Sequence, residues 1–166
     1  MKTMHIFLFP FIVCLFLISC EKEVDKVKPT IDLSIPGAFP VNCDTLYFGE
    51  SFELKVLFMD NVELGSTRAF SIDIHNNFNL HAHSTEVTEC NLDPKKDLEG
   101  LNSFGYTKAF NIPEGVMEHE TNLSIAIPTG NAKGNFEPGD YHFFISLTDK
   151  EGWSAQKGLS IKMLYP

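Results

Sequence analysis

Apolar and polar side chains alternate in several short segments of this chain, and this alternation constrains the fold more than any other feature. The clearest example is residues 52–59, Phe-Glu-Leu-Lys-Val-Leu-Phe-Met. A period of two residues matches the pleat of a β-strand, whose successive side chains point to opposite faces. The pattern predicts strands at residues 30–35, 52–59, 69–75, 106–112, 123–127, 141–147 and 159–164.

Turn-forming residues separate these segments, including Pro-Gly at 36–37 and 138–139 and Glu-Gly at 151–152. About seven short alternating strands in one domain are typical of an immunoglobulin-like antiparallel β-sandwich. Tyr141 directly follows Pro138-Gly139-Asp140 and enters the sixth predicted strand, so it resembles the tyrosine corner of such sandwiches. We therefore predict one all-β domain over residues 30–166.

The N-terminus predicts secretion and lipid attachment. Residues 1–19 combine one lysine with a short apolar run, as a signal peptide does, and the run is too short for an ordinary membrane span. Leu17-Ile18-Ser19-Cys20 resembles a bacterial lipobox, which implies acylation of Cys20 and cleavage before it. Residues 20–29 form a charged tether that resembles the export signal of surface lipoproteins. We predict an outer-membrane lipoprotein on the cell surface, with the periplasmic face as the alternative.

Composition excludes several functions. The net charge is −9 with no basic stripe, which argues against nucleic acid as a partner. The chain has no Gly-rich phosphate loop and no Gly-x-Ser-x-Gly elbow, so we predict that it is not an enzyme. Cys43 and Cys90 remain after the signal and the lipidated cysteine are set aside. Outside the cytosol a disulfide is the simplest prediction for them, and a thiolate metal ligand is the alternative.

Histidines are concentrated in residues 72–83, which read Ile-Asp-Ile-His-Asn-Asn-Phe-Asn-Leu-His-Ala-His. Neutral imidazole is the commonest metal ligand of proteins. If Ile72 and Ile74 face the core, His75 points out of the sheet, and the same parity points His142 outward on residues 141–147. These two strands are antiparallel neighbours in the immunoglobulin topology. His75 and His142 are therefore expected to lie side by side.

His81 and His83 leave the sheet at that same end. We predict a zinc or copper site whose ligands are His75, His81, His83 and His142. Asp73 is the predicted outer partner of the ligands, and His119 is expected at the opposite end of the sandwich.

The alternative function is an adhesion module that binds glycans or surface proteins, in which the histidines are incidental. Aromatic side chains could then offer stacking surfaces for sugars. The candidates are Phe78, Phe104, Tyr106, Phe136 and Phe144.

Several motifs together carry a family resemblance: the lipobox, the charged tether, Ile-Asp-Ile-His-Asn-Asn-Phe, His-Ala-His-Ser, Ile-Ala-Ile-Pro and Gly-Asp-Tyr-His-Phe. The combination resembles an uncharacterised family of Bacteroidetes-type cell-envelope lipoproteins with a single Ig-like domain. The resemblance covers about residues 29–164. It implies a β-sandwich and a cell-envelope location, and it implies no particular activity.

Overall fold

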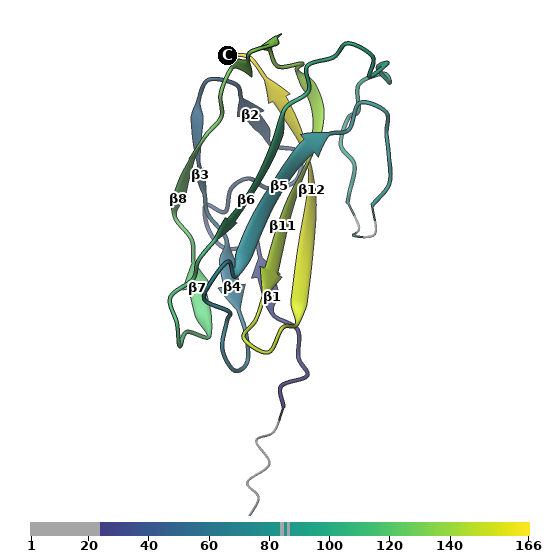
Figure 1. Cartoon of the computed structure of the whole chain (residues 1–166). Coiled ribbons are helices and arrows are strands. Elements are labelled where there is room, and N and C mark those ends of the chain that lie inside the picture. Colours follow the sequence, from purple (N-terminus) through teal and green to yellow (C-terminus); the bar gives the residue numbers. More distant parts are fainter. Residues whose placement is uncertain (1–23, 84, 86) are drawn as a thin grey trace, which may run out of the picture.

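The computed structural model describes residues 24–83, 85 and 87–166 (Figure 1). In this part of the chain the secondary structure is all β, and no helix is long and apolar enough to cross a membrane. The strands are β1 (Thr30–Asp32), β2 (Thr45–Tyr47), β3 (Ser51–Leu54), β4 (Leu57–Met59), β5 (Phe70–Asn76), β6 (Gly105–Phe110), β7 (Glu118–Glu120), β8 (Leu123–Ala126), β9 (Gly130–Asn131), β10 (Gly134–Asn135), β11 (Gly139–Thr148) and β12 (Ser154–Leu164).

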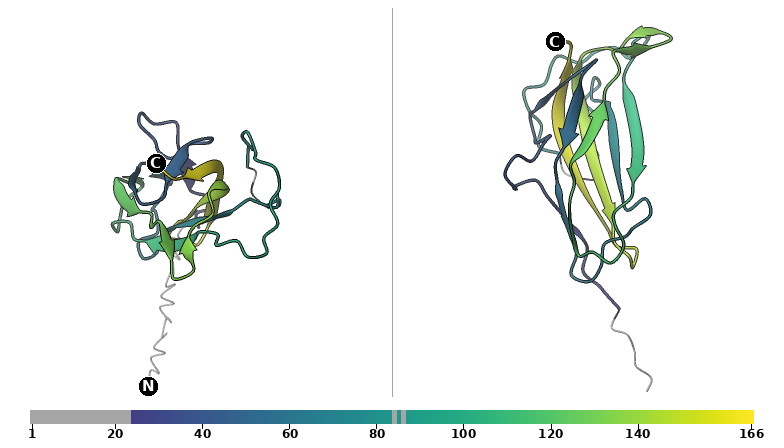
Figure 2. Two further views of the ribbon diagram at one scale, coloured as in Figure 1. Left: turned by 90° about the horizontal axis from the view of Figure 1, so that it is seen from above. Right: turned by 90° about the vertical axis from the view of Figure 1, so that its left-hand side faces the viewer.

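The largest sheet has five strands in the order β2-β12-β11-β5-β6. All neighbours in it are antiparallel except β2, which runs parallel to β12. The facing layer contains β1-β4-β7 and β3-β8, and Figures 1 and 2 show the two layers packed against each other. β9 and β10 form a separate short hairpin.

The core between the layers follows the alternation of the sequence. Phe52, Leu54, Val56 and Phe58 are all 7% exposed or less. Tyr141 is fully buried, and its hydroxyl donates a 2.7 Å hydrogen bond to the Glu137 carbonyl four residues upstream. Burial is also the main cause that raises the pKa of Tyr141 to about 12. The hydroxyl therefore remains protonated and anchors the entry into β11.

The structure has more strands than the seven predicted. One reason is that a long alternating segment is interrupted, and another is that some short strands show no alternation. Residues 52–59 divide into β3 and β4 at Lys55–Val56, where the backbone N–H of Val56 donates to the Thr121 hydroxyl instead of to a strand carbonyl. β2 was missed because only Leu46 of its three residues is buried. Its place in the sheet comes from parallel pairing with β12, which local sequence does not encode.

The connection between β5 and β6 covers the outer face of the large sheet. Residues 139–145 of β11 are all buried, which requires cover on both faces of the strand. Gly158 of β12 permits this close approach, since a methyl group there would lie 2.6 Å from Val87 Cγ2 and 2.7 Å from Phe144 Cε1. Figures 1 and 2 show the connection beside the large sheet, on the side away from β3 and β8.

Candidate metal centre

His75 and His142 are directly opposite residues of the neighbouring strands β5 and β11. Their side chains share the outer face of the sheet because Ile74 and Phe143, the adjacent pair, point into the core. This is the predicted pairing. His142 points outward as predicted, yet none of its surface is exposed, since its exposed fraction is 0%. The β5–β6 connection covers it, and parity alone cannot reveal that cover.

His81 and His83 lie on this connection and turn back onto the strand pair. The ring centroids of His83 lie 4.9 Å from His75 and 4.7 Å from His142, and those of His81 and His83 are 4.7 Å apart. One nitrogen from each of the four rings lies within 4.8 Å of the others, so this histidine cluster could hold a metal ion. The structure thus brings together all four histidines of the predicted site.

His119 lies elsewhere, as expected. It is in β7, opposite Phe58 of β4 in the facing layer. Burial lowers the pKa of its imidazole.

In three of the four rings, one nitrogen lies within hydrogen-bond distance of a side-chain oxygen. His75 Nδ1 lies 2.5 Å from Asp73 Oδ1, His81 Nδ1 lies 2.8 Å from Asn79 Oδ1, and His142 Nε2 lies 3.1 Å from Glu89 Oε1. An oxygen acceptor fixes the proton on the nitrogen that faces it. When such a ring is neutral, its other nitrogen carries a lone pair and is free to bind a metal.

The two carboxylates are themselves positioned by neighbours. Thr107 Oγ1 donates a 2.7 Å hydrogen bond to Asp73 Oδ2, and Asn77 Nδ2 lies 3.4 Å from both carboxylate oxygens of Glu89. Asp73 has the outer position that the sequence predicts. Glu89, Asn79 and Thr107 were missed, and the only signal for Glu89 was its place beside Cys90.

The arrangement around His83 has one donor too few. Its Nε2 atom lies 3.2 Å from His75 Nε2 and 2.8 Å from His142 Nδ1. Both of those atoms carry lone pairs, because the opposite nitrogens of their rings donate to Asp73 and Glu89. A single N–H on His83 can satisfy only one of them. A cation between the rings would satisfy all the lone pairs at once.

The environment of His81 and His83 favours the neutral form of their rings. Burial is the main cause that lowers the pKa of His81 and of His83, and the nearby His142 and His75 lower both further. Glu89 acts in the opposite direction on His81, as Asp73 does on His83. Metal ligation requires neutral imidazole, so the lowered pKa values favour it.

Apolar side chains close one side of the cluster. The ring of Phe144 stacks on His75 with centroids 5.6 Å apart and meets the edge of His83 at 4.6 Å. A pocket of about 380 Å³ lies against three of the histidines, His81, His83 and His142, and is also lined by Leu80 and Leu92. The histidine cluster therefore packs against an aromatic ring and borders a pocket that an ion could enter.

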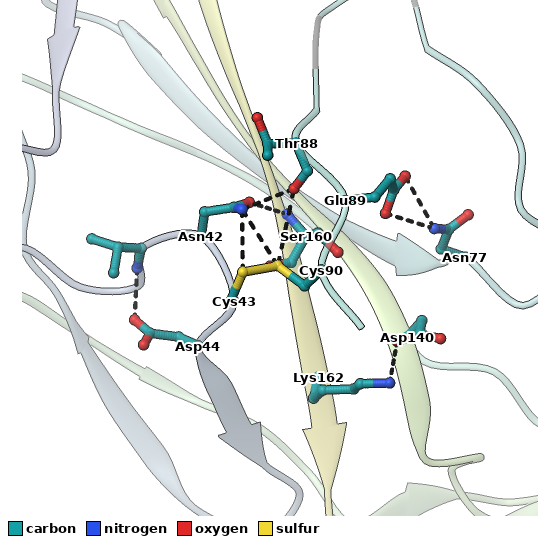
Figure 3. Close-up of a disulfide and its surroundings, with 11 residues drawn as sticks. Asn42, Cys43, Asp44, Asn77, Thr88, Glu89, Cys90, Asp140, Ser160 and Lys162 are labelled. Carbon is teal, nitrogen blue, oxygen red and sulfur yellow. Dashed lines mark hydrogen bonds and ion pairs between the residues drawn. A yellow bond between two sulfur atoms is a disulfide. The ribbon is translucent and has the colours of Figure 1, made fainter. Parts of the chain in front are cut away.

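A disulfide fixes the part of the connection that carries Glu89. Cys43 and Cys90 are joined in the structure with Cα atoms 5.6 Å apart, so neither sulfur is a free thiolate ligand (Figure 3). Asn42 supports the same junction, since its side chain donates to the Thr88 carbonyl at 2.8 Å and accepts from the Ser160 N–H at 2.9 Å. Figure 3 shows Glu89 beside the bridge, with its carboxylate directed to Asn77.

The aromatic residues proposed for sugar stacking do not form an open platform. Four of them are 7% exposed or less, and Tyr106 alone is partly exposed. The buried ones are Phe78, Phe104, Phe136 and Phe144.

The predicted signal peptide and the predicted lipidation site, Cys20, lie outside the described residues. No curated protein and no solved structure matches this chain. Residues 18–164 match a family described as a domain of unknown function (DUF4625), and the chain belongs to that family.

Proposed function

We propose that this protein is a cell-envelope lipoprotein whose domain binds one zinc or copper ion through His75, His81, His83 and His142. The observation that carries the proposal is the position of His83 Nε2 between two ring nitrogens that both carry lone pairs. Three of the rings also have the outer oxygen partner that metal-bound histidines usually have.

Two nitrogen–nitrogen distances at His83 support a tetrahedral ion. Zinc–nitrogen bonds of about 2.0–2.1 Å place two ligands of a tetrahedral site about 3.3–3.4 Å apart. The 3.2 Å between His75 Nε2 and His83 Nε2 is close to this value. The 2.8 Å between His83 and His142 would lengthen by about half an ångström. That adjustment falls on His83, which lies on a connection and not in a strand.

A four-histidine site supports binding without catalysis. Catalytic zinc sites keep a coordination position open for water or substrate, whereas four protein ligands close the tetrahedron. The proposed role is therefore capture or sensing of the metal.

The proposal includes location and fold identity. The lipobox at Cys20 supports an outer-membrane anchor, and the charged tether supports exposure on the cell surface. The hydrogen bond between Tyr141 and the Glu137 carbonyl supports an immunoglobulin-like sandwich with a tyrosine corner. The net charge of −9 supports a partner other than nucleic acid.

Metal analysis of protein purified without a His tag tests the proposal. One equivalent of zinc or copper should bind, and calorimetric titration should show that His83→Ala and His142→Ala each weaken binding at least tenfold. His119→Ala is the matched control, because His119 lies in the other layer. The proposal fails if no zinc or copper binds, or if all three variants bind as the parent does.

A further inference from the structure

Three aspartates meet at the end of the sandwich opposite the histidines. Asp25 precedes β1, Asp60 follows β4, and Asp149 follows β11. One carboxylate oxygen from each lies within 4.8 Å of the others. Asp149 lies seven positions beyond His142, past the far end of the same strand. In Figure 1 this is the end from which the N-terminal segment leaves the domain.

Each aspartate uses one oxygen to hold its own loop. Asp60 Oδ1 accepts the backbone N–H groups of Val62 and Glu63, both at 2.9 Å. Asp149 Oδ1 accepts the N–H of Trp153 at 2.7 Å. Asp25 Oδ1 likewise accepts the N–H of Val27 and the side-chain amide of Asn61. The Oδ1 atoms are therefore engaged, and the Oδ2 atoms are the ones available to a ligand.

Those Oδ2 atoms are buried without any hydrogen-bond partner. Asp25, Asp60 and Asp149 are only 8%, 9% and 3% exposed. Within the described ranges no lysine, arginine or histidine forms an ion pair with any of the three. Lys150, the basic residue next to Asp149, pairs with Glu63 instead. Buried charges are normally paired or coordinate a metal, so three adjoining carboxylates, each with a buried and unpartnered oxygen, call for a cation.

We propose that Asp25, Asp60 and Asp149 bind a calcium ion. Calcium prefers oxygen ligands at about 2.3–2.6 Å, so two oxygens on one ion lie at most about 5.2 Å apart, and the observed limit of 4.8 Å fits. Calcium also accepts irregular sets of carboxylates, backbone carbonyls and water, whereas magnesium demands a near-ideal octahedron. The all-oxygen donor set separates this site from the all-nitrogen histidine cluster.

The fold holds two of the ligands together without the third. Gly65 lies against the end of β11, where a methyl group would be 2.6 Å from the Thr148 carbonyl oxygen. The backbone N–H of Gly65 donates to that carbonyl, and the N–H of Lys150 donates to the Glu63 carbonyl. These contacts bring the loop of Asp60 beside Asp149.

Asp25 differs from the other two aspartates because it lies on the segment that precedes the first strand. Apart from the carboxylate contacts, its carbonyl accepts the indole N–H of Trp153 at 2.9 Å. Calcium would fasten the tether to the base of the domain and so fix how the domain stands on its membrane anchor. The proposed ligand is thus a divalent cation that holds the tether in place against the domain.

Thermal unfolding of the chain from residue 20 onward, with Cys20→Ser to prevent lipidation, tests the site with CaCl₂ against EDTA. Calcium at a hundredfold excess over its dissociation constant should raise the unfolding temperature by about 5–10 °C. Asp60→Asn and Asp149→Asn keep the Oδ1 acceptor and remove the charge. They should unfold at a higher temperature than the parent in EDTA, because repulsion is relieved, and they should lose the calcium response.

Asp97→Asn, an exposed aspartate on the β5–β6 connection, is the control and should respond to calcium as the parent does. His83→Ala should also keep the calcium response, which separates the two sites. The proposal is overturned if calcium causes no shift, if Asp149→Asn responds as the parent does, or if MgCl₂ at the same concentration gives an equal shift.

The tether gives a second readout. Trp153 is the only tryptophan of the chain, and its indole touches the tether at Asp25. Calcium should change its fluorescence and slow trypsin cleavage after the exposed Lys26 severalfold. Calcium-dependent stability with unchanged cleavage and unchanged fluorescence would overturn the role assigned to Asp25.

Discussion

His83 Nε2 lies 2.8 Å from His142 Nδ1, although the two residues are 59 positions apart. His142 is fully buried in β11, whereas His83 lies on the long connection between β5 and β6. The position of His83 therefore depends on the contacts that hold the connection against the sheet. The first two predictions concern the outer partner of His142 and the disulfide beside it.

Glu89→Ala should weaken metal binding about 10–100-fold without unfolding the protein. In the parent, Glu89 accepts from His142 Nε2, so the proton stays on Nε2 and Nδ1 is the nitrogen that can bind the metal. The change removes this acceptor. Calorimetric titration with zinc and copper measures the effect. Glu99→Ala, an exposed change on the same connection, should leave affinity unchanged. Equal affinities in the two variants would show that Glu89 does not contribute to metal binding.

Cys43→Ser with Cys90→Ser should reduce both stability and metal affinity. A disulfide that closes a loop of this length contributes on the order of 4 kcal/mol, and the bridge also holds Glu89 beside His142. Denaturant unfolding of the metal-free and metal-loaded protein separates the two effects. Metal should add less stability to the double variant than to the parent, and an equal increment would show that the bridge does not position the site.

Protonation of the cluster gives a pH dependence with a defined sign. The pKa values of His81 and His83 are lowered in the folded state, mainly by burial, so the unfolded chain binds more protons as pH falls below about 6.5. Their contribution to the stability of the metal-free protein is fully present above that pH and is lost as pH falls through the lowered pKa values. Unfolding free energies between pH 5 and pH 8 should show this loss, and a double His81→Ala/His83→Ala variant should reduce it. Stability that rises toward pH 5 would contradict the assignment.

Gly158→Ala should displace the connection. The added methyl group would meet Val87 and Phe144 at distances that real Cβ contacts do not reach, so Phe144 would move away from His83. We expect a lower unfolding temperature and weaker metal binding. Gly105→Ala is the matched control in the same sheet, because a methyl group there meets nothing within 4 Å. Similar losses in both variants would mean that the effect is general to the sheet.

The predictable part of the site is the part encoded by strand parity. The spacing of Ile72, Ile74 and His75 is enough to place His75 on the outer face, and the topology then selects His142 as its neighbour. What covers that face is not predictable in this way, because the path of the β5–β6 connection depends on the disulfide and on the absence of a side chain at Gly158.

The aspartate cluster left no signal in the sequence. Asp25, Asp60 and Asp149 come from three separate turns, and each resembles an ordinary loop-capping aspartate. Only the packed structure shows that the three carboxylates lie close together and that the second oxygen of each is buried and unpartnered. Glu89 was missed for the same reason, since its role depends on a contact with a residue 53 positions away.

X-ray absorption at the metal edge of the zinc- or copper-loaded protein tests the central claim most directly. The account predicts a first shell of four nitrogens, at about 2.0–2.1 Å for zinc, with the outer-shell scattering of imidazole rings. It also predicts that His119→Ala gives the same spectrum and that His83→Ala loses one imidazole. A first shell of oxygen or sulfur atoms, or a spectrum unchanged in His83→Ala, would contradict it.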